Sequence, residues 1–106
     1  MANAYGLTES DMAQILGACR QFEAIAAVVL FDSRAKGNYK PGSDVDLAVK
    51  GDRITQRTLA QMADRLNEDL PLPYVFDVVH YDTLDQPLVE HIDRVGIVLY
   101  DRASAI

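Results

Sequence analysis

Four short runs of aliphatic and aromatic residues alternate with segments of helical periodicity, and this alternation constrains the fold more than any other feature. Each run has the length of a strand and is rich in β-branched residues. Strands and helices that alternate over a short chain are typical of an α/β or α+β domain, in which helices flank a mixed β-sheet. The runs cover residues 26–31, 45–49, 74–81 and 97–100.

Three further segments place apolar residues at helical spacing, and they predict helices over residues 9–22, 54–70 and 86–94. Thr8 and Asp11 have the spacing of a capping box before the first of these helices. Pro87 in the first turn and Gly96 at the end favour the bounds of the third. The order α-β-loop-β-α-β-α-β predicts a single domain over residues 1–106, with a strand order that periodicity leaves open.

The charge balance narrows the class of partner. Ten Lys and Arg against sixteen Asp and Glu give a formal net charge of −6, which argues against broad binding to nucleic acid or to an anionic membrane surface. The longest uninterrupted apolar run, residues 24–31, is too short to span a bilayer. One cysteine excludes an internal disulfide, and no signal-peptide pattern is present. We therefore expect a cytoplasmic protein.

Two aspartates at the start of the second strand run suggest a metal site. Asp44 and Asp46 are two residues apart, so both project from one face of a strand while Val45 and Leu47 project toward a core. Parallel carboxylates repel each other unless a cation binds between them, and oxygen ligands of this kind suit Mg²⁺. A lone Asp-x-Asp also serves in turns and caps, so the residues around it decide between the two interpretations.

A third acid, Asp77, lies within the run 74–81, which is otherwise largely apolar. Charges are rarely buried without a partner, so an acid in this position requires an explanation. If this strand pairs beside residues 45–49, Asp77 completes a carboxylate triad with Asp44 and Asp46. A triad can hold one or two Mg²⁺ ions, and its third member can accept a proton from an attacking hydroxyl.

The loop before these acids carries positive charge and a serine. Arg34, Lys36 and Lys40 bring positive charge toward an anionic ligand close to the acids. Ser33, at a junction between a strand and a helical turn, can offer its hydroxyl and adjacent backbone N–H groups to a phosphate. Together with the carboxylates, this segment favours a metal–phosphate site.

The loop contains the string Ser33 to Gly37, ten residues lie between Ser33 and Asp44, and Asp44-Val45-Asp46-Leu47 follows. This pattern resembles that of the minimal nucleotidyltransferases of the DNA polymerase β superfamily. The resemblance extends over nearly the whole chain and implies a polymerase β-like nucleotidyltransferase core. It further implies that Asp44, Asp46 and Asp77 form the catalytic and Mg²⁺-binding triad. ATP or another nucleoside triphosphate is then the substrate, and the implied nucleotide-binding residues are Ser33, Arg34, Lys36, Gly37 and Ser43.

Stand-alone members of this family are similar to one half of two-gene pairs, whose other half is a small helical HEPN-domain protein that is often an RNase toxin. The resemblance implies an antitoxin that transfers AMP to a tyrosine hydroxyl of that partner, in a homo- or hetero-oligomer. Nucleotidylation of an aminoglycoside-type small molecule uses the same core but normally needs an additional substrate domain, so it ranks lower.

One position departs from the family pattern, because Asp32 stands where the family has glycine. Glycine lets the backbone approach the triphosphate closely, whereas aspartate adds a side chain and a negative charge. This departure leaves an alternative open, in which the chain is a degenerate nucleotidyltransferase that neutralises its partner by contact alone.

The remaining candidate groups favour structural roles. Cys19 lies on the apolar stripe of the first predicted helix, which indicates a packed thiol. Strand alternation turns His80 away from Asp77, and His91 lies among acids on a short helix, so neither is expected to be a ligand.

Overall fold

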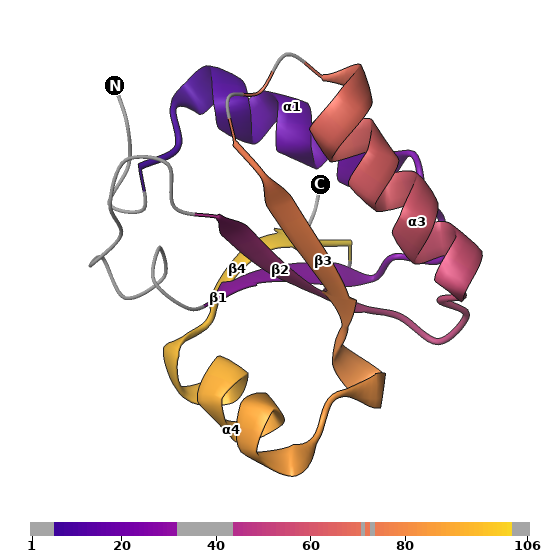
Figure 1. Cartoon of the computed structure of the whole chain (residues 1–106), viewed down its shortest axis with the longest axis vertical. Coiled ribbons are helices and arrows are strands. Elements are labelled where there is room, and N and C mark those ends of the chain that lie inside the picture. Colours follow the sequence, from indigo (N-terminus) through magenta and orange to yellow (C-terminus); the bar gives the residue numbers. More distant parts are fainter. Residues whose placement is uncertain (1–5, 32–43, 71, 73, 103–106) are drawn as a thin grey trace.

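The computed structural model describes residues 6–31, 44–70, 72 and 74–102 (Figure 1). The elements along the chain are α1 (Glu9–Arg20), β1 (Ala27–Phe31), β2 (Val45–Lys50), α3 (Gln56–Asp64), a π-helical segment (Arg65–Asp69), β3 (Phe76–His80), a 3₁₀ turn (Tyr81–Thr83), α4 (Gln86–Val95) and β4 (Ile97–Asp101).

The strands form one mixed four-stranded sheet in the order β3-β2-β1-β4 (Figure 1). Strand β1 is antiparallel to β2 and to β4, whereas β2 and β3 are parallel. The parallel pair requires a crossover, which α3 and the π-helical segment supply. The expected class, a mixed sheet flanked by helices, is confirmed.

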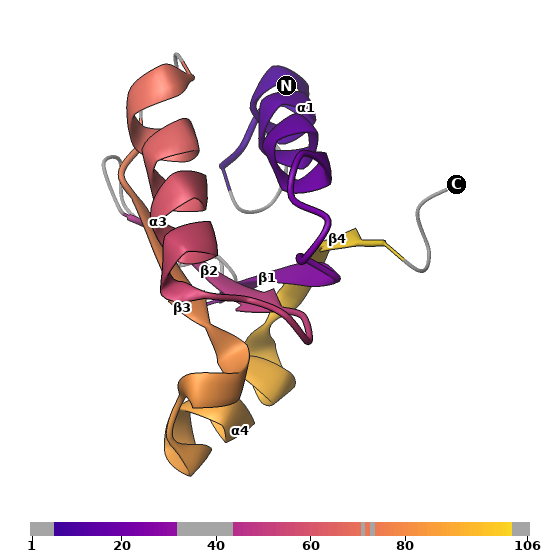
Figure 2. The same cartoon turned by 90° about the vertical axis from the view of Figure 1, so that its right-hand side faces the viewer.

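Helices cover both faces of the sheet. Figure 2 shows α1 and α3 side by side on one face and α4 on the opposite face. The larger core lies under α1 and α3 and joins Ile15 and Cys19 of α1 with Met62 of α3. The smaller core lies under α4 and contains the buried side chains Val29, Phe31, Ala48 and Ile92.

The first helix begins as its sequence predicts and ends earlier. The Thr8 hydroxyl accepts the Asp11 N–H and the Asp11 carboxylate accepts the Thr8 N–H, both at 3.0 Å, so the capping box is confirmed. The helix ends at Arg20 rather than at residue 22. The chain tightens there, because the Phe22 N–H donates to the Cys19 carbonyl three residues back.

The predicted helix over residues 54–70 is present but begins two residues later, at Gln56, and its last part is π-helical rather than α-helical. The Thr55 hydroxyl accepts the Thr58 N–H and thereby sets the start of α3 at Gln56. After Asp64 the helix widens into the π-helical segment, where the Leu70 N–H donates to the Arg65 carbonyl. Leu70 then adopts an extended conformation, as expected for a residue before proline.

The remaining elements lie close to their predicted bounds. Strand β3 is shorter than the predicted run 74–81, and Tyr81 belongs to the 3₁₀ turn instead. Helix α4 carries Pro87 in its first turn and ends at Val95, with Gly96 as its C-cap. In the described ranges, no helix has both the length and the apolar character that a membrane crossing demands.

Candidate active site

Two carboxylates lie beside each other where β2 and β3 begin. Asp46 and Asp77 are direct partners in the parallel register. Neighbouring strands lie about 4.8 Å apart, so the two residues start from adjacent backbone positions. The Val45 N–H donates to the Val75 carbonyl at 2.9 Å and fixes this pairing at its first residue. The pairing of these two strands, on which the place of Asp77 beside Asp46 depends, is therefore present.

Both carboxylates project from the face of the sheet that α4 covers. Val45 and Leu47 point into the larger core, so Asp46 and Ala48 between and after them point the other way. Ala48 belongs to the smaller core, as do Val29 and Phe31 of β1. Asp77 is exposed and Asp46 is partly buried, so this pair lies at the open margin of the smaller core.

Asp44 directly precedes β2 and is exposed. Its spacing from Asp46 puts it at the same end of the sheet, beyond the first residue of the strand. The three acids of the predicted triad thus lie at one end of two neighbouring strands.

The donor chemistry of Asp46 and Asp77 suits Mg²⁺, which commonly takes one or two protein carboxylates and completes its shell with water and phosphate. Within the described parts of the chain, no three His, Cys, Asp or Glu side chains are grouped closely enough to hold a metal ion. The carboxylate pair is observed, whereas the closing of all three acids on one metal stays a prediction.

All five predicted nucleotide-binding residues belong to the segment between β1 and β2. Residues 32–43 lie outside the described residues. These include Asp32, whose orientation bears on the alternative function, and the basic side chains of the loop. The structure does place the residues on either side of this segment, because Phe31 pairs with Asp46 in the antiparallel register of β1 and β2. The flanking residues Phe31 and Asp44 therefore both lie at the carboxylate end of the sheet.

Sequence reasoning missed a polar cluster at the other end of β2, on the same face as Asp46. The Lys50 ammonium lies 4.4 Å from the centre of the Tyr81 ring, and the Tyr81 hydroxyl donates to Asp93 at 2.6 Å. Ionisation of the phenol would remove the proton from that bond, so the bond raises the pKa of Tyr81. Strand alternation predicts that Lys50 lies on the same face as Asp46, but it does not predict that Asp93 of α4 lies near this face.

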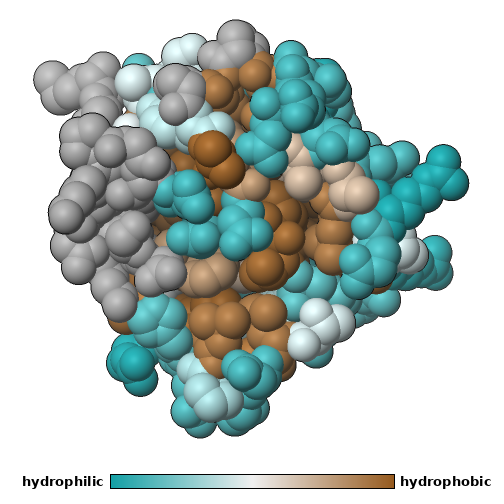
Figure 3. Space-filling view, viewed as in Figure 1, coloured by the Kyte–Doolittle hydropathy of each residue, from teal (hydrophilic) through white to brown (hydrophobic). Residues whose placement is uncertain are grey.

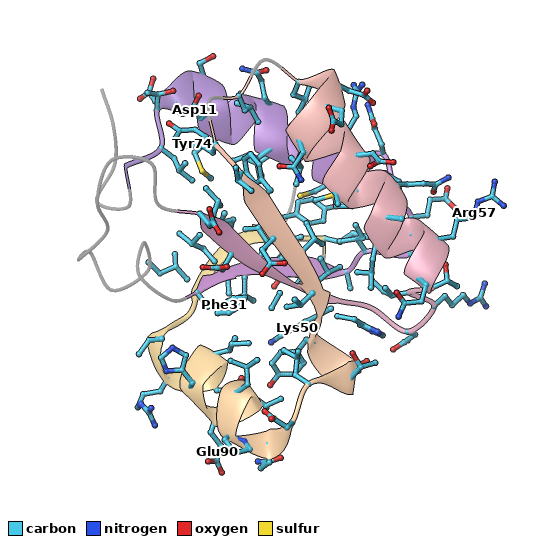
Figure 4. All side chains as sticks on the ribbon, in the orientation of Figure 1. Asp11, Phe31, Lys50, Arg57, Tyr74 and Glu90 are labelled. Carbon is cyan, nitrogen blue, oxygen red and sulfur yellow. The ribbon has the colours of Figure 1, made fainter. Side chains whose placement is uncertain are left out.

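The surface between these two polar groups is apolar. Figure 3 shows hydrophobic surface in the region where β3 and α4 lie, bordered by hydrophilic side chains. Val79, Tyr81 and Leu88 pack against the smaller core there, and Figure 4 shows Lys50 between the sheet and α4. The carboxylates therefore lie at one end of an apolar surface, and the Lys50–Tyr81–Asp93 cluster lies at its other end.

Sequence reasoning also missed a bond that holds the start of β3. The Tyr74 hydroxyl donates to the Asp11 carboxylate at 2.6 Å (Figure 4). Asp11 is only 8% exposed and also accepts the Thr8 N–H. Its capping role was visible in the sequence, but no local pattern could show a partner 63 residues away.

The groups expected to be structural are placed as follows. Cys19 is fully buried, and burial raises the pKa of its thiol to about 12. The His80 Nε2 atom lies 3.7 Å from the Asp82 carboxylate. His80 is the last residue of β3 and is therefore at the other end of the strand from Asp77. His91 is partly buried on α4.

A family model described as "Polymerase beta, Nucleotidyltransferase" matches residues 13–105. A search of curated proteins returned no significant match.

Solved structures share the fold at low sequence identity. A toxin–antitoxin structure with AMP-PNP has a TM-score of 0.73 and 22% identity, over 86% of this chain and 73% of that chain. A tri-AMPylated Shewanella oneidensis HEPN toxin in complex with an MNT antitoxin gives 0.65 and 20%, over 85% and 69%. A putative nucleotidyltransferase from Sulfolobus solfataricus gives 0.53 and 18%, over 90% and 82%.

Proposed function

The chain belongs to the polymerase β nucleotidyltransferase family, and from that premise we propose that it transfers AMP from ATP to a tyrosine hydroxyl of a HEPN-domain partner. In this role it is the antitoxin of a toxin–antitoxin pair. The observation that carries the proposal is the direct pairing of Asp46 with Asp77 across β2 and β3. This pairing unites the Asp-x-Asp motif with a carboxylate that lies 31 residues further along the chain.

The transfer step is a displacement at phosphorus. The hydroxyl oxygen of the acceptor forms a bond to the α-phosphorus of ATP, while the bond from that phosphorus to the bridging β-phosphate oxygen breaks. Pyrophosphate leaves with the bonding electrons, and the hydroxyl proton passes to a carboxylate. Asp77 is the proposed acceptor of this proton, or a metal ligand, because it is the more exposed member of the pair.

Positioning and charge neutralisation supply most of the catalysis in such a step. Asp44, Asp46 and Asp77 are the proposed ligands of Mg²⁺, which when bound neutralises the charge that develops on the phosphate oxygens. The proposed phosphate-binding residues are Ser33, Arg34, Lys36, Gly37 and Ser43. The placement of the flanking residues Phe31 and Asp44 at the carboxylate end of the sheet supports this assignment.

The proposed partner is inferred from the structural neighbours. Toxin–antitoxin complexes recur among them, one of which contains AMP-PNP and another a tri-AMPylated HEPN toxin with its MNT antitoxin.

The test is transfer of label from α-³²P-ATP to a small helical HEPN-domain protein, the proposed class of partner, with and without Mg²⁺. We expect label on the partner only when Mg²⁺ is present. Asp46→Asn and Asp77→Asn should each reduce the rate on the order of 100-fold or more, because each removes a charged ligand from the reacting phosphate site.

The matched control is Asp64→Asn, which neutralises an exposed acid on α3, away from the carboxylate pair. This variant should retain the wild-type rate. Absence of label transfer by the wild-type chain would contradict the proposal, as would full activity of Asp77→Asn.

A second candidate function rests on Asp32, which replaces the glycine of the family motif. In this alternative the chain neutralises its partner by contact, without transfer. Asp32→Gly distinguishes the two functions, because it should greatly increase ATP binding only if the aspartate has disabled the site. Under the contact function, Asp46→Asn should still neutralise the partner.

A further inference from the structure

Asn67, in the π-helical segment, makes two hydrogen bonds to the backbone of a single residue in β3. Its side-chain oxygen accepts the Phe76 N–H at 2.7 Å, and its side-chain nitrogen donates to the Phe76 carbonyl at 3.0 Å. The side-chain amide of Asn67 is therefore hydrogen-bonded to both the N–H and the carbonyl of Phe76, as the backbone of a neighbouring strand would be.

The two bonds form on the side of β3 that has no strand beside it. Strand β3 is the edge of the sheet, and β2 lies on its other side. On the β2 side, the Val75 carbonyl accepts the Val45 N–H. Strand β3 is thus held from both sides at the same point, by β2 through Val75 and by Asn67 through Phe76.

Phe76 directly precedes Asp77, and it is also held by its side chain. The ring is 4% exposed in the larger core and meets the Tyr74 ring edge to face, with centroids 6.2 Å apart. Because its ring and both of its backbone groups are fixed, Phe76 sets the position from which the side chain of the next residue projects. That next residue is Asp77, which faces the opposite side and pairs with Asp46.

Asn67 lies in the middle of the π-helical segment Arg65–Asp69. A π turn adds a residue to the helical repeat and is often found at functional sites. The widened turn from Arg65 to Asp69 lies at the end of the crossover that delivers the chain to β3.

We propose that Asn67 is a positioning residue of the carboxylate site, which holds Phe76 and thereby keeps Asp77 in line with Asp46. The proposal rests on the proposed function in assigning Asp77 to the metal and acceptor site. It adds a residue that touches neither metal nor substrate. Groups that hydrogen-bond directly to metal ligands typically contribute 10- to 100-fold to metal affinity or activity, and Asn67, which acts through the residue before Asp77, is expected at the lower end of this range.

The test compares Asn67→Ala with Glu68→Ala, a neighbouring exposed residue of the same segment. The full chain is titrated with Mn²⁺ in the absence of nucleotide, and water proton relaxation reports the bound ion. We expect Asn67→Ala to weaken Mn²⁺ binding about 10-fold and to reduce hydrogen-exchange protection of the Phe76 amide. Glu68→Ala should change neither quantity.

The transfer assay adds a second measurement on the same variants. Asn67→Ala should lower kcat about 10-fold at an unchanged KM for ATP. A merely structural role would lower the melting temperature and leave both Mn²⁺ affinity and kcat of the folded protein unchanged, which would overturn the inference. Should Asn67→Ala not fold, Asn67→Ser replaces it under the same criteria.

Failure of the inference and failure of the proposed function are distinguishable. If the wild-type chain binds Mn²⁺ through Asp77 and Asn67 contributes to that binding, but no AMP transfer occurs, only the function fails. If transfer occurs and Asn67→Ala matches the wild type in both assays, only the inference fails. A wild-type chain that binds no Mn²⁺ and transfers no AMP contradicts both, whereas one that binds no Mn²⁺ but transfers AMP contradicts the inference alone.

Discussion

At the scale of single residues, Asp46 and Asp77 each occupy the second position of a parallel strand. The matching positions make them direct partners, and both side chains leave the sheet on the α4 face. A register shift of one residue would place a different side chain beside Asp46 and turn the moved acid toward the core that contains Leu47. The proposed chemistry thus depends on strand register as much as on residue type.

Cys19 gives a prediction about pH. Burial raises the pKa of its thiol from 9.0 to about 12 in the folded chain. Below pH 9 the thiol is neutral in both states. Between pH 9 and about 12 only the unfolded chain ionises, so the stability is lost progressively across this window. Relative to Cys19→Ala, the free energy of unfolding should fall by about 1.4 kcal/mol per pH unit there.

The measurement is urea unfolding of both proteins at pH 8, 10 and 11. The alanine variant cancels the titration of tyrosines and lysines, which both proteins share. A difference in stability that does not change with pH would contradict the prediction. At pH 8, the folded wild type should also react slowly with a thiol reagent, because the thiolate is the nucleophile.

At the scale of elements, β3 is a five-residue edge strand that depends on side chains from the helices around it. Tyr74, just before the strand, is bonded to Asp11 of α1, and Phe76 is bonded to Asn67. An edge strand has hydrogen bonds to one neighbouring strand only, which for β3 is β2. The additional bonds from Asp11 and Asn67 therefore hold β3 more firmly than the bonds to β2 alone would. The site is therefore stabilised by elements on the opposite face of the sheet.

Tyr74→Phe tests this connection. The substitution removes the hydroxyl that donates to Asp11 at 2.6 Å, and it leaves the ring in place. Because the Asp11 carboxylate is largely buried, we expect the free energy of unfolding to fall by about 1–3 kcal/mol in a urea titration. Tyr81→Phe is the matched control, since its bond to Asp93 is exposed and should contribute less. Equal losses in the two variants would contradict the prediction.

At the scale of the whole molecule, distant parts of the chain pack tightly at both ends of the sheet, at Gly51 on the end opposite the carboxylates and at Gly96 on the carboxylate end. A Cβ at Gly51 would lie 2.0 Å from the Ala24 carbonyl oxygen, so the turn after β2 contacts the chain before β1 without room for a side chain. A Cβ at Gly96 would lie 2.6 Å from Val29 Cγ1, which explains the glycine between α4 and β4. The φ of Gly96 is −68°, so close packing rather than left-handed backbone requires it.

Gly51→Ala tests this packing. The added methyl meets a backbone oxygen, so the two turns must separate, and we expect a loss of about 2 kcal/mol or more in the free energy of unfolding. Gly17→Ala is the matched control, because a Cβ there meets nothing within 4 Å on α1. That variant should be more stable by roughly 0.5–1 kcal/mol, since alanine favours helix. A Gly51→Ala variant as stable as the wild type would contradict the prediction.

The local features of the fold could be predicted from the sequence. The Thr8–Asp11 capping box, the apolar stripe that contains Cys19 and the strand run before Phe31 depend on neighbours within a few residues. Periodicity and capping chemistry report such neighbours directly. The π-helical segment could not be predicted in this way, because its residues have the same apolar spacing as an ordinary helix.

The mixed α/β class and the Asp-x-Asp motif can be predicted from the amino-acid sequence, because they depend on side-chain type and on spacing along the chain. The pairing of Asp46 with Asp77 and the parallel direction of β2 and β3 are visible only in the folded chain. The same is true of the bonds by which Asn67 and Tyr74 hold β3. Strand order and contacts between helix and strand edge arise from packing between residues far apart in the chain, and no periodicity records them.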